Sequence, residues 1–426
     1  MKENVTIISK VRIYPTDEQA KMLSDMTSRY RAGCNFVSRH IFKTHDMRQP
    51  SLNKKLYHDL REHYDLKSQM AQSVIKTTIA SYRTLIDEKT GLPKDKQALQ
   101  KAKKRRSGKK TNVKHRYGKS AKRTKRKNRK RQMDMRGWTR VEFHKPCADL
   151  VYNRDWSFVD NYAHLSINTL GNRIRVTYEP ASIDNTLSGR TFVKWGTAKV
   201  VNRHGMWFLH IPVTMEVDST DLFDVGNVVG VDVGINFLAV SYDSKGKSQF
   251  FDGHQVKHRR SQYVKTRASL QRKQTPSARR RLKKMSGREN RWMRDVNHCV
   301  SKTLVTSKSK GTLFVLEDLT GIRSKTERVR KRYRSVSVSW AFYELQTLIE
   351  YKAALAGDRT VKVDPSYTSQ CCPKCGHTEA SNRDKRTHTF VCRTCGYTSN
   401  DDRIGAMNLQ EKGKAYVRKA RSTGLQ

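Results

Sequence analysis

The feature of this sequence that most constrains its fold is a segment that cannot form a packed core. Between Lys101 and Arg131, 18 of 31 residues are Lys or Arg and none is Asp or Glu. Repulsion between so many like charges opposes compaction, so we expect folded modules on either side of the segment. Such a run could be a solubilising or localising tail. Its position in the middle of the chain favours a role in neutralising the phosphates of a nucleic acid.

The charge of the whole chain indicates the same kind of partner. The 426 residues include 87 Lys or Arg and 39 Asp or Glu, which gives a formal net charge of +48. A field of this sign attracts polyanions, so nucleic acid is the expected partner. A chain of this length is expected to form about two to four domains.

Composition excludes several other classes of protein. Apolar residues make up 36% of the chain, and 13 Phe, 17 Tyr and 6 Trp supply enough bulk for a core, which argues against disorder throughout. No apolar run approaches the ~18 residues that a membrane-spanning helix requires. The opening residues MKENVTIISKVRIYP lack the apolar stretch of a secretory signal, so we expect a cytoplasmic protein associated with nucleic acid.

The first half of the chain predicts a β module interrupted by helices. A strand is expected over Val5 to Ile13, and Thr16 with Gln19 has the spacing of a capping box that starts a helix. A second amphipathic helix is predicted from Ser68 to Leu85. Alternating residues between Val141 and Val217 predict an antiparallel β-barrel or sandwich, which the N-terminal strand would complete.

Three acidic residues in the second half follow or interrupt apolar stretches. Asp232 and Glu317 lie in or directly after apolar strands, and one acid of the adjacent pair Asp401 and Asp402 opens a helix that contains the small residues Gly405 and Ala406. A carboxylate in such a place costs free energy unless a cation or a donor compensates it. Any one of them could be an ordinary solvated strand end. Together they predict a site of oxygen ligands for Mg²⁺ or Mn²⁺, and two such ions about 3.5–4 Å apart can hydrolyse a phosphodiester.

Two Cys-x-x-Cys pairs predict a structural zinc site. Cys372 and Cys375 form one pair, Cys392 and Cys395 form the other, and a glycine directly follows each pair. Glycine permits the tight turn that directs both thiolates of a pair at one ion. Four thiolates leave no open position on Zn²⁺, so the expected role is structural. A redox dithiol is the alternative, and Cys371 is a spare because it lacks the spacing.

The stretch from Lys257 to Arg294 carries 15 Lys or Arg against one acid, Glu289. Pro276 and Gly287 are expected to divide it into helices. A helix that is merely solvated would mix charges of both signs, so we expect one charged face that follows a phosphate backbone. A later helix over Trp340 to Gly357 is predicted to pack in the core, with a dimer face as the alternative.

These motifs together resemble the TnpB family of transposon-encoded nucleases. The resemblance is carried by Gly230-Val-Asp232-Val-Gly234, by Val315-Leu316-Glu317-Asp318-Leu319, and by the run from Asp364 to Gln370 that leads into Cys372-Pro-Lys-Cys375-Gly. Residues 228–412 are covered well, and the first 220 residues match only in the order of their modules. The resemblance implies an RNase H-like (RuvC) nuclease domain, shared with type V CRISPR effectors.

In that family the metal-binding catalytic acids would be Asp232, Glu317 and Asp402. The pattern places two small residues three and four positions after the last Asp, which selects Asp402 rather than Asp401. Ile404 departs from the pattern, since the family usually has Asn there. The resemblance also implies a prokaryotic protein with a zinc ribbon inserted before its last catalytic acid.

The expected fold is multidomain and combines α/β, all-β and all-α modules. Its predicted parts are the first strand of a β-barrel wedge domain (1–14), a helical recognition insert with the basic segment 101–131 (15–132), the rest of the wedge domain with an acidic linker from Glu216 to Asp224 (133–225), the RuvC-like domain (226–365), the zinc ribbon (366–398), and the end of the RuvC-like domain with a basic tail (399–426). The resemblance places the basic helices along a guide–target duplex, where the candidate contacts are Arg259, Arg260, Arg279, Arg280, Arg281, Lys283 and Lys284.

The leading hypothesis is an RNA-guided DNA endonuclease. Charge and carboxylates indicate a nuclease directly, whereas the guide RNA, the double-stranded DNA target and the reading of a short flanking motif follow from the resemblance. One alternative is a miniature type V CRISPR effector that uses a CRISPR guide rather than a transposon-end RNA. Others are a non-catalytic nucleic-acid-binding regulator and a transposase or recombinase that joins strands. Either a monomer or a homodimer could bind one RNA.

Overall fold

The computed structural model describes residues 2–90, 139–319, 342–384 and 386–423, so the basic segment 101–131 and Trp340 lie outside the described residues. Contacts divide the chain into two compact units of mixed α and β structure. One unit is Thr6–Met215, and the other combines Met1–Val5 with Glu216–Gln426. No helix in the described ranges is long and apolar enough to cross a membrane.

Three helices of the first unit pack together. They are α1 (Asp17–Thr44), α2 (Gln49–Glu62) and α3 (Ser68–Thr90), and α3 contacts both others. The predicted capping box is confirmed, because the Thr16 hydroxyl accepts from the backbone of Gln19 and the Gln19 side chain accepts from the backbone of Thr16. The helix predicted from Ser68 is confirmed as α3, while α2 was not predicted.

An eight-stranded sheet is formed by one strand before these helices and seven strands after them. Its strands are β1 (Lys2–Tyr14), β2 (Cys147–Leu150), β3 (Trp156–Val159), β4 (His164–Asn168), β5 (Arg173–Tyr178), β6 (Thr191–Trp195), β7 (Ala198–Arg203) and β8 (Met206–Asp218), with the short helix α6 (Ala181–Leu187) between β5 and β6. The order β2-β7-β8-β1-β5-β4-β3, with β6 on β8, confirms that the N-terminal strand joins the later strands. Because β8 continues to Asp218 and Leu222 is buried, the acidic stretch 216–224 is not a free linker.

The second unit is built on a five-stranded sheet in the order β11-β10-β9-β12-β13. These strands are β9 (Asn227–Asp232), β10 (Phe237–Tyr242), β11 (Ser248–Asp252), β12 (Thr312–Glu317) and β13 (Arg359–Val363). Strand β9 is antiparallel to β10 and parallel to β12, and β12 is parallel to β13. In the register of β9 and β12, Leu316 lies opposite Val231, so the carboxyl ends of these two strands share one edge of the sheet.

Both faces of this sheet are covered, because successive apolar residues of a strand point to opposite faces and each face buries its own set. Val229 and Val231 face a core formed with α9 (Arg288–Thr306) and α12 (Phe342–Leu355). Val228 faces the opposite core, which includes residues of α13 (Asp401–Thr423). The prediction that the helix near residue 345 packs in the core is confirmed by the buried Leu345.

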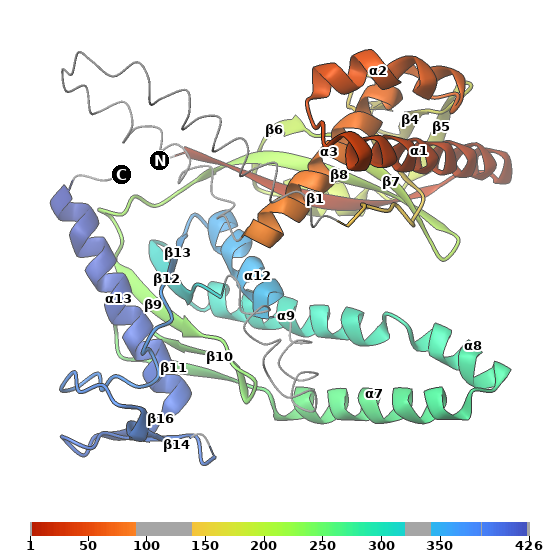
Figure 1. Cartoon of the computed structure of the whole chain (residues 1–426). Helices are drawn as coiled ribbons and strands as arrows, with labels where there is room; N and C mark the ends of the chain where they lie inside the picture. The colour runs from red at the N-terminus through yellow and green to blue at the C-terminus, as the bar shows by residue number, and fades with distance from the viewer. Residues whose placement is uncertain (1, 91–138, 320–341, 385, 424–426) are drawn as a thin grey trace, which may run out of the picture. The chain divides into compact units, whose positions relative to one another are not determined.

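Helix α13 lies unusually close to β9 (Figure 1). A Cβ atom on Gly230 would lie 2.0 Å from the backbone oxygen of Ala406, and one on Gly413 would lie 2.3 Å from Cγ2 of Val315. Because no real Cβ tolerates such distances, only glycine allows this approach. The structure confirms that small residues of α13 permit close packing, and it adds Gly413 of α13 and Gly230 of β9 to the residues that allow it.

A small ribbon precedes α13 and contacts its first turns. It contains β14 (Arg383–Asp384), β15 (Thr389–Val391) and β16 (Thr398–Asn400), which form an antiparallel sheet. Ile404, the residue that departs from the family pattern, is fully buried with Cys372, Phe390 and Cys392. This side chain therefore joins α13 to the core of the ribbon.

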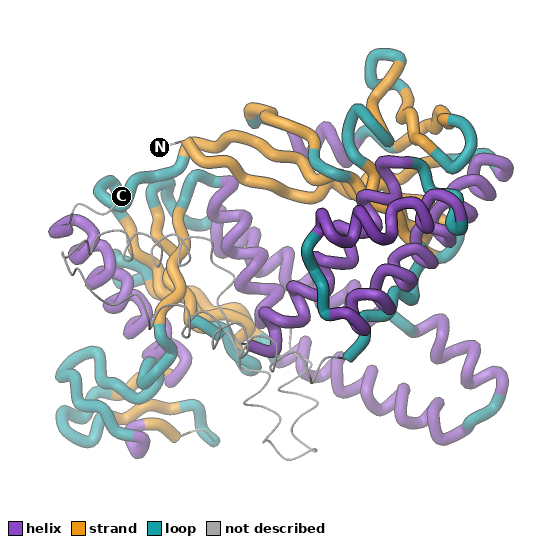
Figure 2. The backbone as a smooth tube through the Cα atoms, turned by 45° about the horizontal axis from the view of Figure 1, so that its top comes forward, coloured by secondary structure: helices purple, strands orange, loops and turns teal. Residues whose placement is uncertain are grey.

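The basic stretch forms three consecutive helices, α7 (His254–Lys273), α8 (Pro276–Met285) and α9, which extend from the sheet as a long hairpin (Figures 1 and 2). The breaks fall where they were predicted. Pro276 begins α8 after a Thr275 cap, and Gly287 precedes α9 with a φ of 77°. Met293 and Val256 join the core against the sheet.

Candidate functional site

Two of the predicted acids end neighbouring strands of the five-stranded sheet. Asp232 is the last residue of β9, and Glu317 is the last residue of β12. Asp402 reaches the same edge from the first turn of α13. A Cβ atom on Gly234 would lie 3.7 Å from Oδ2 of Asp402, and one on Gly405 would lie 2.8 Å from Oδ2 of Asp232. The structure therefore brings all three predicted acids to one edge of the sheet.

These acids repel one another. Burial, and then the charges of Glu317 and Asp402, raise the pKa of Asp232 well above its usual value. Burial also raises the pKa of Glu317, although the Thr368 hydroxyl opposes this by donating to Oε1 at 2.7 Å. Burial and the neighbouring Asp401 raise the pKa of Asp402 to about 6. Carboxylates that resist ionising together are stabilised in the charged form by a bound cation.

The donor set fits hard divalent ions. All three side chains offer carboxylate oxygens, which Mg²⁺ and Mn²⁺ prefer. They do not form one small coordination sphere, since among the described residues only the cysteines bring three or more potential ligand atoms within 4.8 Å of one another.

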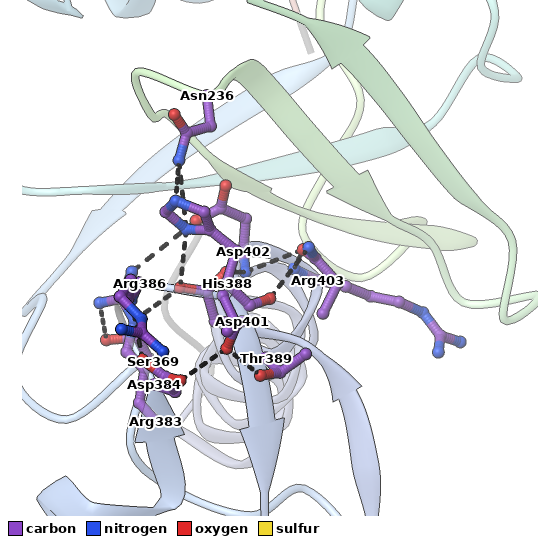
Figure 3. A network of polar contacts seen from close by, with 12 residues as sticks. Asn236, Ser369, Arg383, Asp384, Arg386, His388, Thr389, Asp401, Asp402 and Arg403 are labelled. Carbon is purple, nitrogen blue, oxygen red and sulfur yellow. Dashed lines mark hydrogen bonds and ion pairs between the residues drawn. The ribbon is translucent and has the colours of Figure 1, made fainter.

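The acids next to Glu317 and Asp402 lie in different surroundings. Asp318 is exposed, and its backbone N–H donates to Val363. Asp401 is fully buried, and its Oδ2 accepts from Nε of Arg383 at 2.8 Å. Asp401 is therefore bonded to a residue of the ribbon, as Figure 3 shows.

Sequence reasoning missed Arg383. This residue lies in β14 of the ribbon, and its Nη2 is 3.8 Å from Oδ1 of Asp402. Its positive charge lowers the pKa values of Asp232, Glu317 and Asp402, against the larger effect of burial. Nothing in the local sequence distinguishes Arg383 from the other basic residues, because only folding of the ribbon against α13 brings it to the acids.

A histidine and an asparagine extend this network. His388 of the ribbon places Nδ1 at 3.5 Å from Oδ2 of Asp401, and it also contacts the Asn236 amide in the turn after β9 (Figure 3). The ribbon is thus joined to the sheet edge by polar contacts as well as by the buried Ile404.

The four predicted cysteines converge. Sγ of Cys372 is 3.7 Å from Sγ of Cys395, and Sγ of Cys375 is 3.5 Å from Sγ of Cys392. Four sulfurs at about 2.3 Å from one tetrahedral Zn²⁺ would be separated by roughly 3.8 Å, so the cluster is compatible with zinc. Cys371 is outside the cluster, as its spacing predicted.

The same kind of turn follows each pair of cysteines. Gly376 and Gly396 have φ values of 76° and 69°, in the left-handed region that glycine adopts without strain. Their backbone N–H groups donate to Cys372 and Cys392. The predicted tight turn after each cysteine pair is confirmed.

Six of the seven predicted nucleic-acid residues are exposed on α7 and α8, namely Arg259, Arg279, Arg280, Arg281, Lys283 and Lys284. Arg260 differs, because its side chain is 13% exposed and pairs with Glu289 at 3.5 Å. A side chain in that position stabilises the packing of α7 on α9. Three of the exposed residues, Arg280, Arg281 and Lys284, line an open groove of about 580 Å³ together with Tyr263 and Met285.

Two family models match parts of the chain. A model described as "Probable transposase" matches residues 210–320, which include β9 and β12. A model described as "Cas12f1-like, TNB domain" matches residues 342–409, which include the ribbon.

Individual relatives also match about half of the chain. The chain is 31% identical to the CRISPR-associated endodeoxyribonuclease Cas12f1 of Sulfoacidibacillus thermotolerans over 53% of this chain and 55% of that protein. It is 31% identical to the putative RNA-guided DNA endonuclease InsQ of Escherichia coli K12 over 50% of this chain and 55% of that protein. The chain thus spans about half the length of these two relatives.

The chain matches a larger share of the TnpB-like protein MJ0751 of Methanocaldococcus jannaschii. It is 30% identical to the chain over 44% of this chain and 69% of its own length. The shared residues and the arrangement of acids and cysteines lead to one assignment: this chain belongs to the family of TnpB-like proteins.

Proposed function

We propose that this protein is an RNA-guided DNA endonuclease that hydrolyses phosphodiester bonds at the edge of its five-stranded sheet. The observation that carries the proposal is the meeting of Asp232, Glu317 and Asp402 beside one arginine at one sheet edge, where burial raises the pKa of each acid. Such an arrangement is costly for stability unless it binds cations. Perturbed carboxylates that face one another are typical of active sites.

Asp232, Glu317 and Asp402 would hold two Mg²⁺ or Mn²⁺ ions. Bound there, the ions supply an activated water and stabilise the leaving oxygen, so no protein base is needed. Thr368 orients Glu317 through its hydrogen bond, which leaves the second oxygen of that carboxylate for an ion. Arg383, whose Nη2 is 3.8 Å from Oδ1 of Asp402, would stabilise the negative charge that develops on a phosphate bound there.

Each module of the chain has a proposed role in such a nuclease. We assign the five-stranded sheet with α13 to an RNase H-like (RuvC) nuclease domain, and the four cysteines to a structural zinc ribbon. The eight-stranded sheet would be the β-barrel wedge domain, and α1 to α3 would be the recognition insert that reads a flanking DNA motif with it. The exposed basic face of α7 and α8 would follow the backbone of a guide RNA–target DNA duplex.

The experiment is to purify the chain with its RNA, sequence that RNA and replace its guide segment. The proposal predicts one defined RNA species, and cleavage of a DNA duplex that matches the new guide. Random RNA fragments, or cleavage that ignores the guide, would contradict guidance by RNA. The origin of the RNA decides between a transposon end and a CRISPR array.

The match to a model described as a probable transposase makes strand joining the alternative to test on the same products. Hydrolysis predicts free 3′ and 5′ ends only. Joined products would favour a transposase.

A further inference from the structure

We infer that Asp401 is a positioning residue that fixes the guanidinium of Arg383 beside Asp402. The inference rests on the proposed nuclease function and adds to it a division of labour between two adjacent aspartates. Asp402 turns toward Asp232 and the sheet edge. Asp401 is 0% exposed and accepts a hydrogen bond from Nε of Arg383 at 2.8 Å.

All three nitrogens of the guanidinium have a separate partner. Nε donates to Asp401, Nη1 donates to Oγ of Ser369 at 3.0 Å, and Nη2 lies 3.8 Å from Oδ1 of Asp402 (Figure 3). A planar guanidinium held at two corners cannot rotate, so its third corner stays directed at Asp402. Ser369 directly follows Thr368, the residue that orients Glu317.

Capping of α13 does not account for Asp401. Its Oδ1 accepts from the backbone N–H of Asp402 at 3.0 Å, but Oδ1 of Asn400 accepts from the same N–H at 3.1 Å. Asn400 also accepts from the N–H of Arg403 at 3.1 Å. The helix N-terminus is therefore satisfied without Asp401, whose Oδ2 serves Arg383 and lies 3.5 Å from His388.

A buried carboxylate fits this task because it holds Arg383 without taking part in the ion site. The Arg383 side chain is 24% exposed, so without Asp401 it would have room to turn toward solvent. Asn at position 401 keeps the size and the Oδ1 acceptor but removes the charge that holds Nε. The substitution Asp401→Asn therefore loosens Arg383 while leaving the cap of α13 in place.

The first test measures Arg383 directly and does not depend on cleavage. Purified full-length chains are treated with phenylglyoxal, and modification of Arg383 is quantified by peptide mass spectrometry. We expect faster modification in Asp401→Asn than in the wild type. The matched control is Asp384→Asn in the same strand, because that exposed carboxylate bonds Arg386 and Thr387 instead. Equal reactivity of Arg383 in Asp401→Asn and the wild type would overturn the inference.

The second test uses the RNA-loaded protein. Asp401→Asn should lower the cleavage rate at saturating DNA by about 10- to 100-fold and leave DNA affinity unchanged. In an Arg383→Ala background the same change should cost less than about twofold, because the residue acts through Arg383. Costs that multiply would reject the positioning role while nuclease activity stands. A wild-type protein that cuts no DNA would contradict the proposed function. The phenylglyoxal result would still test whether Asp401 positions Arg383.

Discussion

Gly405 and Asp232 are so close that a Cβ atom on Gly405 would lie 2.8 Å from a carboxylate oxygen of Asp232. The glycine on α13 therefore sets where the acid on β9 can be. Gly405→Ala should displace that carboxylate, and a displacement of about 1 Å can cost on the order of 10²-fold in rate. We predict slower cleavage and a higher Mg²⁺ requirement, measured by metal titration of the cleavage rate.

The control for this change is Gly226→Ala in the same unit. A Cβ atom there meets nothing within 4 Å, so activity should be retained. An active Gly405→Ala protein with an unchanged metal requirement would show that Asp232 is not constrained by α13.

Neighbouring cysteines offer a second prediction. Cys372→Ser removes one of the four clustered sulfurs, whereas Cys371→Ser leaves the cluster complete. Since structural zinc contributes its binding energy to folding, Cys372→Ser should lose zinc and lower the melting temperature of the ribbon region. Zinc per chain is measured by mass spectrometry of the metal. Equal zinc content in the two variants would contradict the assignment.

A buried ion pair predicts how stability depends on pH. Lys308 Nζ lies 3.0 Å from Asp243 Oδ2, and the two side chains are 5% and 8% exposed. Burial raises the pKa of Asp243, but the Lys308 hydrogen bond and backbone N–H donors outweigh it, and the net shift is downward. A lowered pKa stabilises the fold above the unfolded value of about 3.9, and that contribution is lost as the pH falls through the folded value.

Asp243→Asn should therefore cost about 3 kcal/mol near neutral pH, because it leaves a buried ammonium unpaired. The difference from the wild type should shrink below about pH 4. Urea unfolding at several pH values measures it, with the exposed Asp224→Asn as a control. A difference that stays constant down to pH 3 would argue against the pair as its source.

Salt dependence tests the basic groove. Each phosphate contact contributes about 0.7–0.9 to the slope of log affinity against log salt concentration. Replacing Arg280, Arg281 and Lys284 with alanine should reduce the slope for a guide–target duplex by about 2. The exposed Lys245, Lys247 and Lys310, outside the groove, supply a charge-matched comparison. If their replacement by alanine changed the slope as much, the groove would have no special role.

The sequence was most informative where a charged residue stands in an apolar stretch. Asp232 and Glu317 stand out because each ends an apolar strand, and the structure places both at one edge of the sheet. Asp402 could be distinguished from Asp401 only by its spacing to Gly405 and Ala406. The burial of Asp401 could not be predicted from the sequence, because adjacent residues of a first helical turn point in different directions.

Ion pairs between residues far apart in the chain could not be predicted from the sequence. Arg260 lies in a run of equivalent basic residues, and only the fold of the helical hairpin brings it to Glu289. Arg383 likewise reaches Asp402 through folding of a ribbon whose sequence shows only its cysteines and glycines. Charge density predicts that a face is basic, but it does not identify which of its members are already paired.

The most direct test of the central claim is cleavage by Asp232→Asn, loaded with guide RNA and supplied with Mg²⁺ and matching DNA. We expect normal RNA and DNA binding with cleavage reduced to background, whereas Asp318→Asn, which alters the exposed neighbour of Glu317, should cut normally. Cleavage by Asp232→Asn at the wild-type rate would contradict the assignment of this sheet edge as the active site.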